Sequence, residues 1–318
     1  MPEPRNRELP VQIYLPIADL PVNIFVILAI GLAVGFVSGM FGIGGGFLMT
    51  PLLIFLGISP AVAVASVTGH IAASSMSGAI SYWRRRAVDL ALVFMLLAGG
   101  FVGTASGVWL FTLLRTLGQL DITIGLLYVL LLGVVGALMV IESVRAIIRV
   151  RQGKPVELRR PGSHTWIHGL PFKLRFKRSR IYVSAIPVWG IGFFIGLLGA
   201  VMGIGGGFLL VPMLIYMLRV PTATVIGTSM VVTLVTMATA TVMHATTNHL
   251  VDAVLALILM VGGVIGAQFG ARAGQKMGGE RLRLLLGLLV LAVGIRFALD
   301  LVLPPETVYS IRPLDSDV

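Results

Sequence analysis

The chain has 318 residues, of which 57% are hydrophobic and only 12% are charged. A soluble protein of this length could not bury so much apolar surface, so the composition predicts a membrane protein. The absence of cysteine excludes disulfides and thiolate metal sites. The net charge is +11, but the basic residues lie in loops between apolar runs, as the positive-inside rule expects, and this distribution argues against nucleic-acid binding.

The first half of the chain contains five apolar runs. A glycine-rich break follows the first run, and the second run is only about ten residues long, half of what a membrane span needs. Three arginines, at positions 84–86, follow the third run. The five runs cover residues 22–41, 47–56, 60–83, 88–114 and 122–148.

The second half repeats this order after a long basic loop at residues 149–180. Its runs cover residues 183–202, 208–218, 221–244, 251–274 and 284–301. We therefore divide the chain into a first repeat (1–150, with an N-terminal tail at 1–21), a basic cytoplasmic loop (151–182), a second repeat (183–303) and a C-terminal tail (304–318).

A ten-residue motif marks the same place in both halves. GIGGGFLMTP begins at Gly42, and GIGGGFLLVP begins 161 residues later at Gly203, with eight identical positions. Pro60 and Pro221 follow at the same offset. A duplicated unit with a glycine break in an apolar run indicates a transporter whose binding site lies between two repeats.

The short run after each break is expected to be a half-helix, because about ten residues span only ~15 Å. We expect it to form, with the helix after it, a pair that enters and leaves the membrane from one side. Three further full spans make the crossing number of each half odd, which inverts the second repeat. All basic clusters then lie inside, and residues 246–249 and both termini lie outside. The alternative is that each pair spans as one kinked helix.

The two copies of Gly-x-Gly-Gly-Gly-Phe-Leu-x-x-Pro resemble the sulfite exporter TauE/SafE family, a group of bacterial permeases formerly known as a domain of unknown function. The resemblance covers about residues 23–301. IGTS at 226–229 is similar to a Gly-Thr-Ser element of the family, whereas SVT stands at 66–68 in the first copy. The resemblance implies export of small sulfur-containing anions, such as sulfite or organosulfonates like sulfoacetate, through the cytoplasmic membrane.

Three consecutive glycines at each break form the first part of the candidate substrate site. Glycine allows one helix to end and another to begin, and a helix start carries unpaired N–H groups and partial positive charge. Such groups bind anions without a charged side chain. The alternative is close helix packing, which we prefer for glycines 99–100 and 262–263. The candidate glycines are Gly44, Gly45, Gly46, Gly205, Gly206 and Gly207.

Polar side chains near the breaks form the second part. Hydroxyls donate to anion oxygens, although in helices they often bond back to their own backbone. His70 is the one titratable group well inside an apolar run and could carry a proton, or it is a neutral histidine held within the bundle. Asp89 and Asp252 are expected to cap the helices that they precede. The candidate hydroxyls belong to Ser66, Thr68, Thr228 and Ser229.

The sequence predicts an all-α polytopic secondary transporter built from two inverted repeats. It shows no catalytic set, no Walker element and no metal or cofactor motif, so its expected partners are a small anion and the lipid bilayer. Proton coupling and uniport stay open, as do the individual anion and the oligomeric state. The alternatives are an anion channel using the same helix ends, and a membrane enzyme or assembly factor acting on sulfur compounds.

Overall fold

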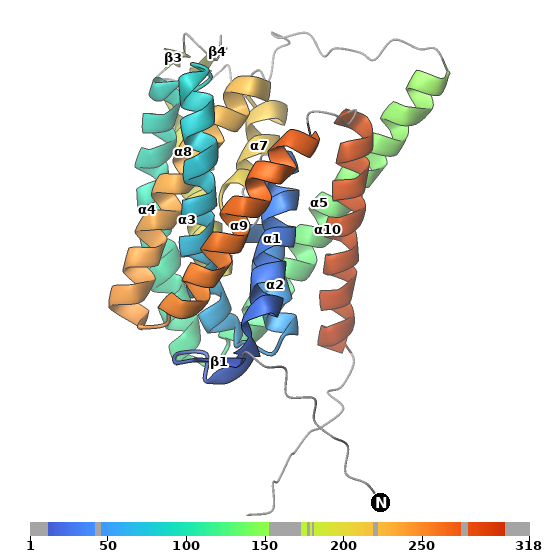
Figure 1. Cartoon of the computed structure of the whole chain (residues 1–318). Coiled ribbons are helices and arrows are strands. Elements are labelled where there is room, and N and C mark those ends of the chain that lie inside the picture. Colours follow the sequence, from blue (N-terminus) through green and yellow to red (C-terminus); the bar gives the residue numbers. More distant parts are fainter. Residues whose placement is uncertain are drawn as a thin grey trace, which may run out of the picture.

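The computed structural model describes residues 12–41, 46–152, 173–176, 179, 181–218, 222–274 and 279–302, which form a helical bundle with two short hairpins (Figure 1). Helices are expected because lipid offers no hydrogen bonds to the backbone. The helices of the first half are α1 (Ile24–Phe41), α2 (Gly46–Phe55), α3 (Pro60–Arg84), α4 (Leu90–Thr116) and α5 (Leu120–Arg151). Those of the second half are α6 (Ala185–Met202), α7 (Gly207–Tyr216), α8 (Thr222–Met243) with the π-helical turn η2 (His244–Asn248), α9 (Ala253–Gly274) and α10 (Gly279–Val302).

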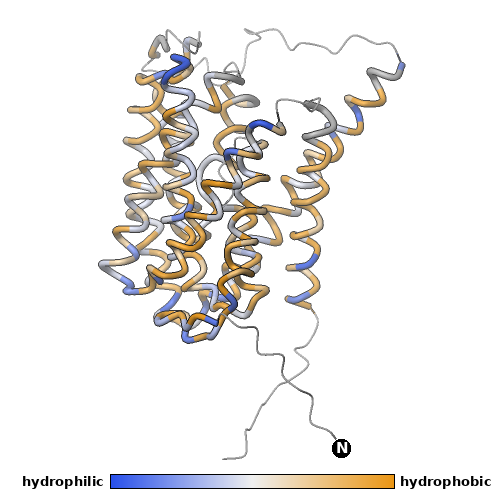
Figure 2. Tube along the Cα trace, viewed as in Figure 1, coloured by the Kyte–Doolittle hydropathy of each residue, from blue (hydrophilic) through white to orange (hydrophobic). Residues whose placement is uncertain are grey.

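The apolar surface of the bundle confirms the prediction of a multi-pass membrane protein. Among the described residues, six helices are long and apolar enough to cross a bilayer: α4, α5, α6, α8 with η2, α9 and α10. Hydrophobic residues line most of the bundle, and hydrophilic residues lie mainly toward its two ends (Figure 2). Large side chains such as Phe94 and Trp109 are exposed on the outside, where lipid would cover them.

An antiparallel hairpin precedes the first helix of each half, and the sequence analysis missed both. Strands β1 (Gln12–Leu15) and β2 (Leu20–Asn23) lead into α1, and β3 (Lys173–Phe176) and β4 (Ile181–Ser184) lead into α6. The two hairpins lie at opposite ends of the bundle (Figure 1).

The helices alternate in direction between these two ends. From the end that carries β1, helices α3, α5 and α9 run to the opposite end, and α4, α8 and α10 run back (Figure 1). Arg84, Arg151 and Arg272 lie in the last turns of α3, α5 and α9, so they share the end of the bundle that carries β3 and β4.

One detail of the expected topology is wrong: the half-helix does not return with the helix that follows it. The turn between α2 and α3, with Gly57 at φ +88°, lies at the end where α1 begins. Helix α3 has 25 residues, or about 37 Å, and runs from one end of the bundle to the other. The returning pair is therefore α1 with α2. Because α2 and α3 run in opposite directions, they are also not one kinked span.

Helices from different halves pack against each other throughout the bundle. The main pairs are α1 with α9, α4 with α6, α5 with α10, and α3 with α8. Glycine permits the close approach in the first two pairs. A Cβ atom on Gly262 would lie 2.6 Å from the carbonyl oxygen of Leu28, and a Cβ atom on Gly99 would overlap the carbonyl oxygen of Trp189. The packing interpretation of the glycine pairs at 99–100 and 262–263 is thus confirmed.

Candidate functional site

The start of α2, which follows the first glycine break, meets the second glycine break in the middle of the bundle. The aromatic rings of Phe47 and Phe208, which follow the last glycine of each motif, stack with centroids 4.5 Å apart. A Cβ on Gly46 would lie 2.6 Å from the carbonyl oxygen of Ile204, inside the second break. From this meeting point α2 runs to one end of the bundle and α7 to the other (Figure 1). Of the candidate glycines, Gly44 and Gly45 lie outside the described residues.

The second break ends one helix and begins another within four residues. Gly203, at φ +65°, caps α6 by donating its N–H to the Gly199 carbonyl, and Gly205 has φ +75°. These left-handed conformations explain glycine at both positions. Gly206 then precedes α7 and supplies no side chain to cap it. Residues 203–208 are all buried, so the first N–H groups of α7 point into the protein interior without a helical acceptor.

The carbonyl groups at this break, in contrast, have partners from the first half. Tyr128 Oη donates to the Met202 carbonyl at 2.7 Å, and Thr50 Oγ1 donates to the Gly203 carbonyl at 3.2 Å. These hydrogen bonds satisfy carbonyl groups at the end of α6, and the start of α7 carries a partial positive charge. The geometry suits an anion.

Thr68 and Ser229 bond within their own helices. Thr68 Oγ1 donates to the Ala65 carbonyl at 2.7 Å, and Ser229 Oγ donates to the Ile226 carbonyl at 2.9 Å. Thr68 Oγ1 also accepts a hydrogen bond from Thr241 at 2.9 Å. Both hydroxyls therefore bond back to their own helix backbone, which was the alternative to anion binding.

Ser66 and Thr228 instead connect the two halves. Ser66 Oγ accepts from the backbone N–H of Asp252 at 2.9 Å, and Thr228 Oγ1 accepts from that of Asp89 at 3.3 Å. Each hydroxyl thus holds the start of a helix that belongs to the other half. Within the described part of the chain, no hydrogen bond links any of the four candidate hydroxyls to the glycine breaks.

Asp89 and Asp252 cap helices as expected, and each also holds a hairpin. Their Oδ1 atoms accept from Leu92 N at 3.4 Å and Leu255 N at 3.0 Å. Asp89 Oδ2 accepts from both the N–H and the hydroxyl of Ser179, in the β3–β4 turn, at 2.8 Å. Asp252 Oδ2 accepts from Ile17 N at 3.0 Å, in the β1–β2 turn. Sequence reasoning found the caps but missed these contacts, because nothing local indicates the hairpins.

The β1–β2 turn also carries a solvent-facing hydrogen bond. Tyr14 Oη donates to the Asp19 carboxylate, and this hydrogen bond raises the pKa of the Tyr14 phenol above its ordinary value. The interaction lies at the exposed tip of the hairpin and away from the glycine breaks.

His70 is fully buried at the contact between α3 and α9. Its imidazole occupies the space left free by Gly263, and neither ring nitrogen has a hydrogen-bond partner in the described residues. The histidine therefore fills a glycine notch between helices. A role in proton transfer stays a prediction.

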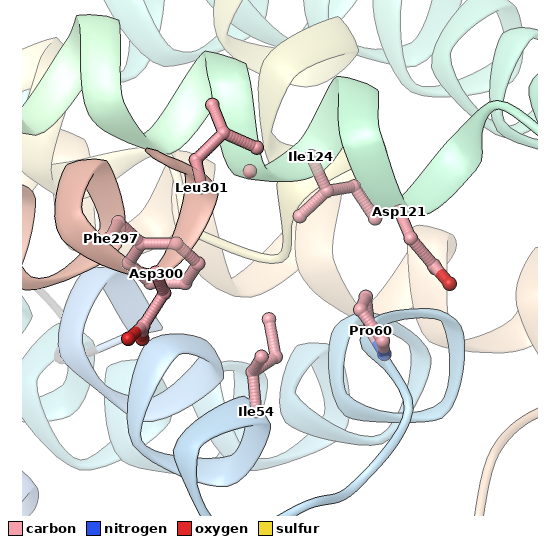
Figure 3. Close-up of a pocket in the computed structure, with 8 residues that line it drawn as sticks. Ile54, Pro60, Asp121, Ile124, Phe297, Asp300 and Leu301 are labelled. Carbon is pink, nitrogen blue, oxygen red and sulfur yellow. The ribbon is translucent and has the colours of Figure 1, made fainter. Parts of the chain in front are cut away.

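A cleft of about 150 Å³ lies at the end of the bundle, between α2, the start of α3, α5 and α10 (Figure 3). Its lining is mostly apolar and includes two carboxylates, those of Asp121 and Asp300. Asp300 pairs with Arg296 at 3.3 Å. Because the carboxylates repel negative charge, this cleft does not suit an anion, and the glycine breaks remain the better candidate site.

Comparisons with known proteins find one family and several membrane transporter proteins. The chain matches the model of the family described as Sulfite exporter TauE/SafE over residues 27–297. A probable membrane transporter protein of Xylella fastidiosa is 31% identical over 283 residues, covering 86% of this chain and 94% of that protein. The probable membrane transporter proteins YjnA and YunE of Bacillus subtilis are 26% and 24% identical, with 85% of this chain and 98% and 96% of theirs covered. No solved structure matches significantly.

Proposed function

We propose that this chain, which belongs to the sulfite exporter TauE/SafE family of membrane transporters, moves a small sulfur-containing anion across the bacterial cytoplasmic membrane. Sulfite and short organosulfonates such as sulfoacetate are the proposed substrates, and net transport is outward. An inside-negative potential favours anion exit by about 2.3 kcal/mol per charge per 100 mV, so uniport suffices.

The observation that carries the proposal is the buried, uncapped start of α7 at the centre of the bundle. An anion bound there accepts hydrogen bonds from the free N–H groups of the first turn and neutralises the positive helix end. Among the residues whose burial the structure describes, no lysine or arginine is buried. Attraction of an anion to the interior thus rests on backbone groups.

The contacts between the halves support two inverted repeats. Packing of α1 on α9 parallels that of α6 on α4, and the hydrogen bond from Asp252 to Ser66 parallels that from Asp89 to Thr228. We place the end with the arginines in the cytoplasm, which puts both termini outside. Alternating access then consists of rocking about the central breaks, which exposes the anion to one side at a time.

The Gly206→Leu variant tests the site. A Cβ on Gly206 would lie 2.6 Å from Ile195 Cγ2, and a larger side chain would fill the space in front of α7. We expect the wild-type protein to be stabilised by sulfite, thiosulfate or sulfoacetate in thermal-shift measurements, by about 2.7 kcal/mol at a ligand concentration 100 times Kd. Gly206→Leu abolishes this response.

Gly190→Leu is the matched control, because no atom lies within 4 Å of a Cβ on Gly190, so this variant keeps the response. Unchanged anion affinity in a correctly folded Gly206→Leu protein contradicts the assignment of the site. Taurine and short carboxylates in the same screen define the substrate class.

A counterflow experiment distinguishes a carrier from an anion channel. The Phe47 and Phe208 rings are stacked where the start of α2 meets the second break, so they have to move before an anion passes. We expect liposomes preloaded with unlabelled substrate to accumulate labelled substrate transiently. Conductance far above carrier turnover, with no counterflow, would instead show a channel.

A further inference from the structure

We propose that the hydroxyl of Thr233 is a side-chain ligand of the anion bound at the start of α7. This inference rests on the proposed function and adds one hydroxyl to its site.

Thr233 lies on α8 and is 1% exposed. Its Oγ1 atom has no hydrogen-bond partner among the described residues. Neighbouring threonines on the same helix differ: Thr236 donates to the Val232 carbonyl and Thr239 to the Val235 carbonyl, each at 2.9 Å. A buried hydroxyl without a partner loses its hydration and gains nothing in return. A bound molecule beside this hydroxyl would supply the missing partner, so the assignment depends on what lies next to Thr233.

The position of Thr233 shows where that molecule binds. Its Oγ1 atom lies 3.3 Å from the place that a Cβ on Gly206 would occupy, next to the first turn of α7. The N–H groups of that turn and the Thr233 hydroxyl are all hydrogen-bond donors that need an acceptor. Sulfite and sulfonate groups each offer three oxygens with negative charge, so one anion satisfies both sets of donors.

The test is anion affinity of the purified full-length protein, measured by titration with sulfite and with sulfoacetate. Thr233→Val removes the hydroxyl with little change in shape, and we expect affinity for both anions to fall about 10- to 100-fold, as for loss of a hydrogen bond to a charged group. Thr233→Ser keeps the hydroxyl and stays near wild-type affinity. Thr239→Val, whose hydroxyl already has a partner, leaves affinity unchanged. The melting temperature of the ligand-free Thr233→Val protein does not fall.

Each other outcome has a distinct meaning. If the wild-type protein binds neither anion, both the proposed function and this inference fail. If the wild type binds but Thr233→Val binds equally well, the hydroxyl is not a ligand, while the proposed function stands. If Thr233→Ser loses as much affinity as Thr233→Val, packing rather than hydrogen bonding is responsible, and the inference is overturned.

Discussion

Replacement of Gly192 by alanine is expected to destabilise the protein severely, although only one methyl group is added. Gly192 lies on α6, where it contacts α4, and its Cβ would lie 2.1 Å from the carbonyl oxygen of Leu96. Backbone cannot rotate away as a side chain can, so the two helices have to separate. Overpacking of this kind costs about 1–3 kcal/mol or more. A clear drop in melting temperature in detergent, or loss of folded protein, is the expected measurement.

Gly190→Ala provides a control of opposite sign two residues away on the same helix. No atom lies within 4 Å of a Cβ on Gly190, so alanine meets no obstacle there. Because alanine favours helix over glycine by roughly 1 kcal/mol, this variant should be as stable as the wild type or slightly more so. Equal melting temperatures for the two variants would mean that α4 and α6 are not packed as closely as described.

Asp252→Asn is expected to release the β1–β2 hairpin from the bundle. The buried carboxylate uses one oxygen to cap α9 and the other to accept from Ile17 in the hairpin turn. Asparagine has one acceptor oxygen, so it can serve the helix or the hairpin but not both. Loss of one charge-assisted hydrogen bond amounts to about 2 kcal/mol, or roughly 30-fold faster amide exchange in the hairpin. Hydrogen exchange measured on peptides containing Ile17 and Ala18 tests this.

The other half of the molecule supplies the control. Asp89→Asn affects the contact with Ser179 and should accelerate exchange in the β3–β4 hairpin while leaving Ile17 and Ala18 protected. If both variants accelerate exchange everywhere, the carboxylates stabilise the whole fold rather than one hairpin each.

The sequence predicted the helices and breaks well because their signals are local. Long apolar runs can only be helices in lipid, and a glycine run at the same place in both halves marks the interruption. The caps at Asp89 and Asp252 were predictable for the same reason: an Asp before an apolar run accepts from the first turn.

Features set by distant contacts could not be predicted. The hairpin contacts of Asp252 connect residues 235 positions apart, and no pattern near either residue indicates them. Ser66 and Thr228 are close to the breaks in sequence, which made them candidate ligands. On a helix, however, a shift of one or two positions turns a side chain to a different face, and these two hydroxyls contact Asp252 and Asp89 instead. Thr233 is one of several threonines in α8, and the sequence alone does not indicate that its buried hydroxyl has no partner among the described residues.

The pairing of α1 with α9 has a consequence for biosynthesis. Between Ile24, where α1 begins, and Ala253, where α9 begins, the ribosome has to add 229 residues. Until α9 is made, α1 lacks the helix against which its glycines pack. In the same way, α4 lacks α6 until the first half is complete. Neither half of the gene product is therefore a folding unit, and assembly of the scaffold has to wait until nearly the whole polypeptide has been inserted.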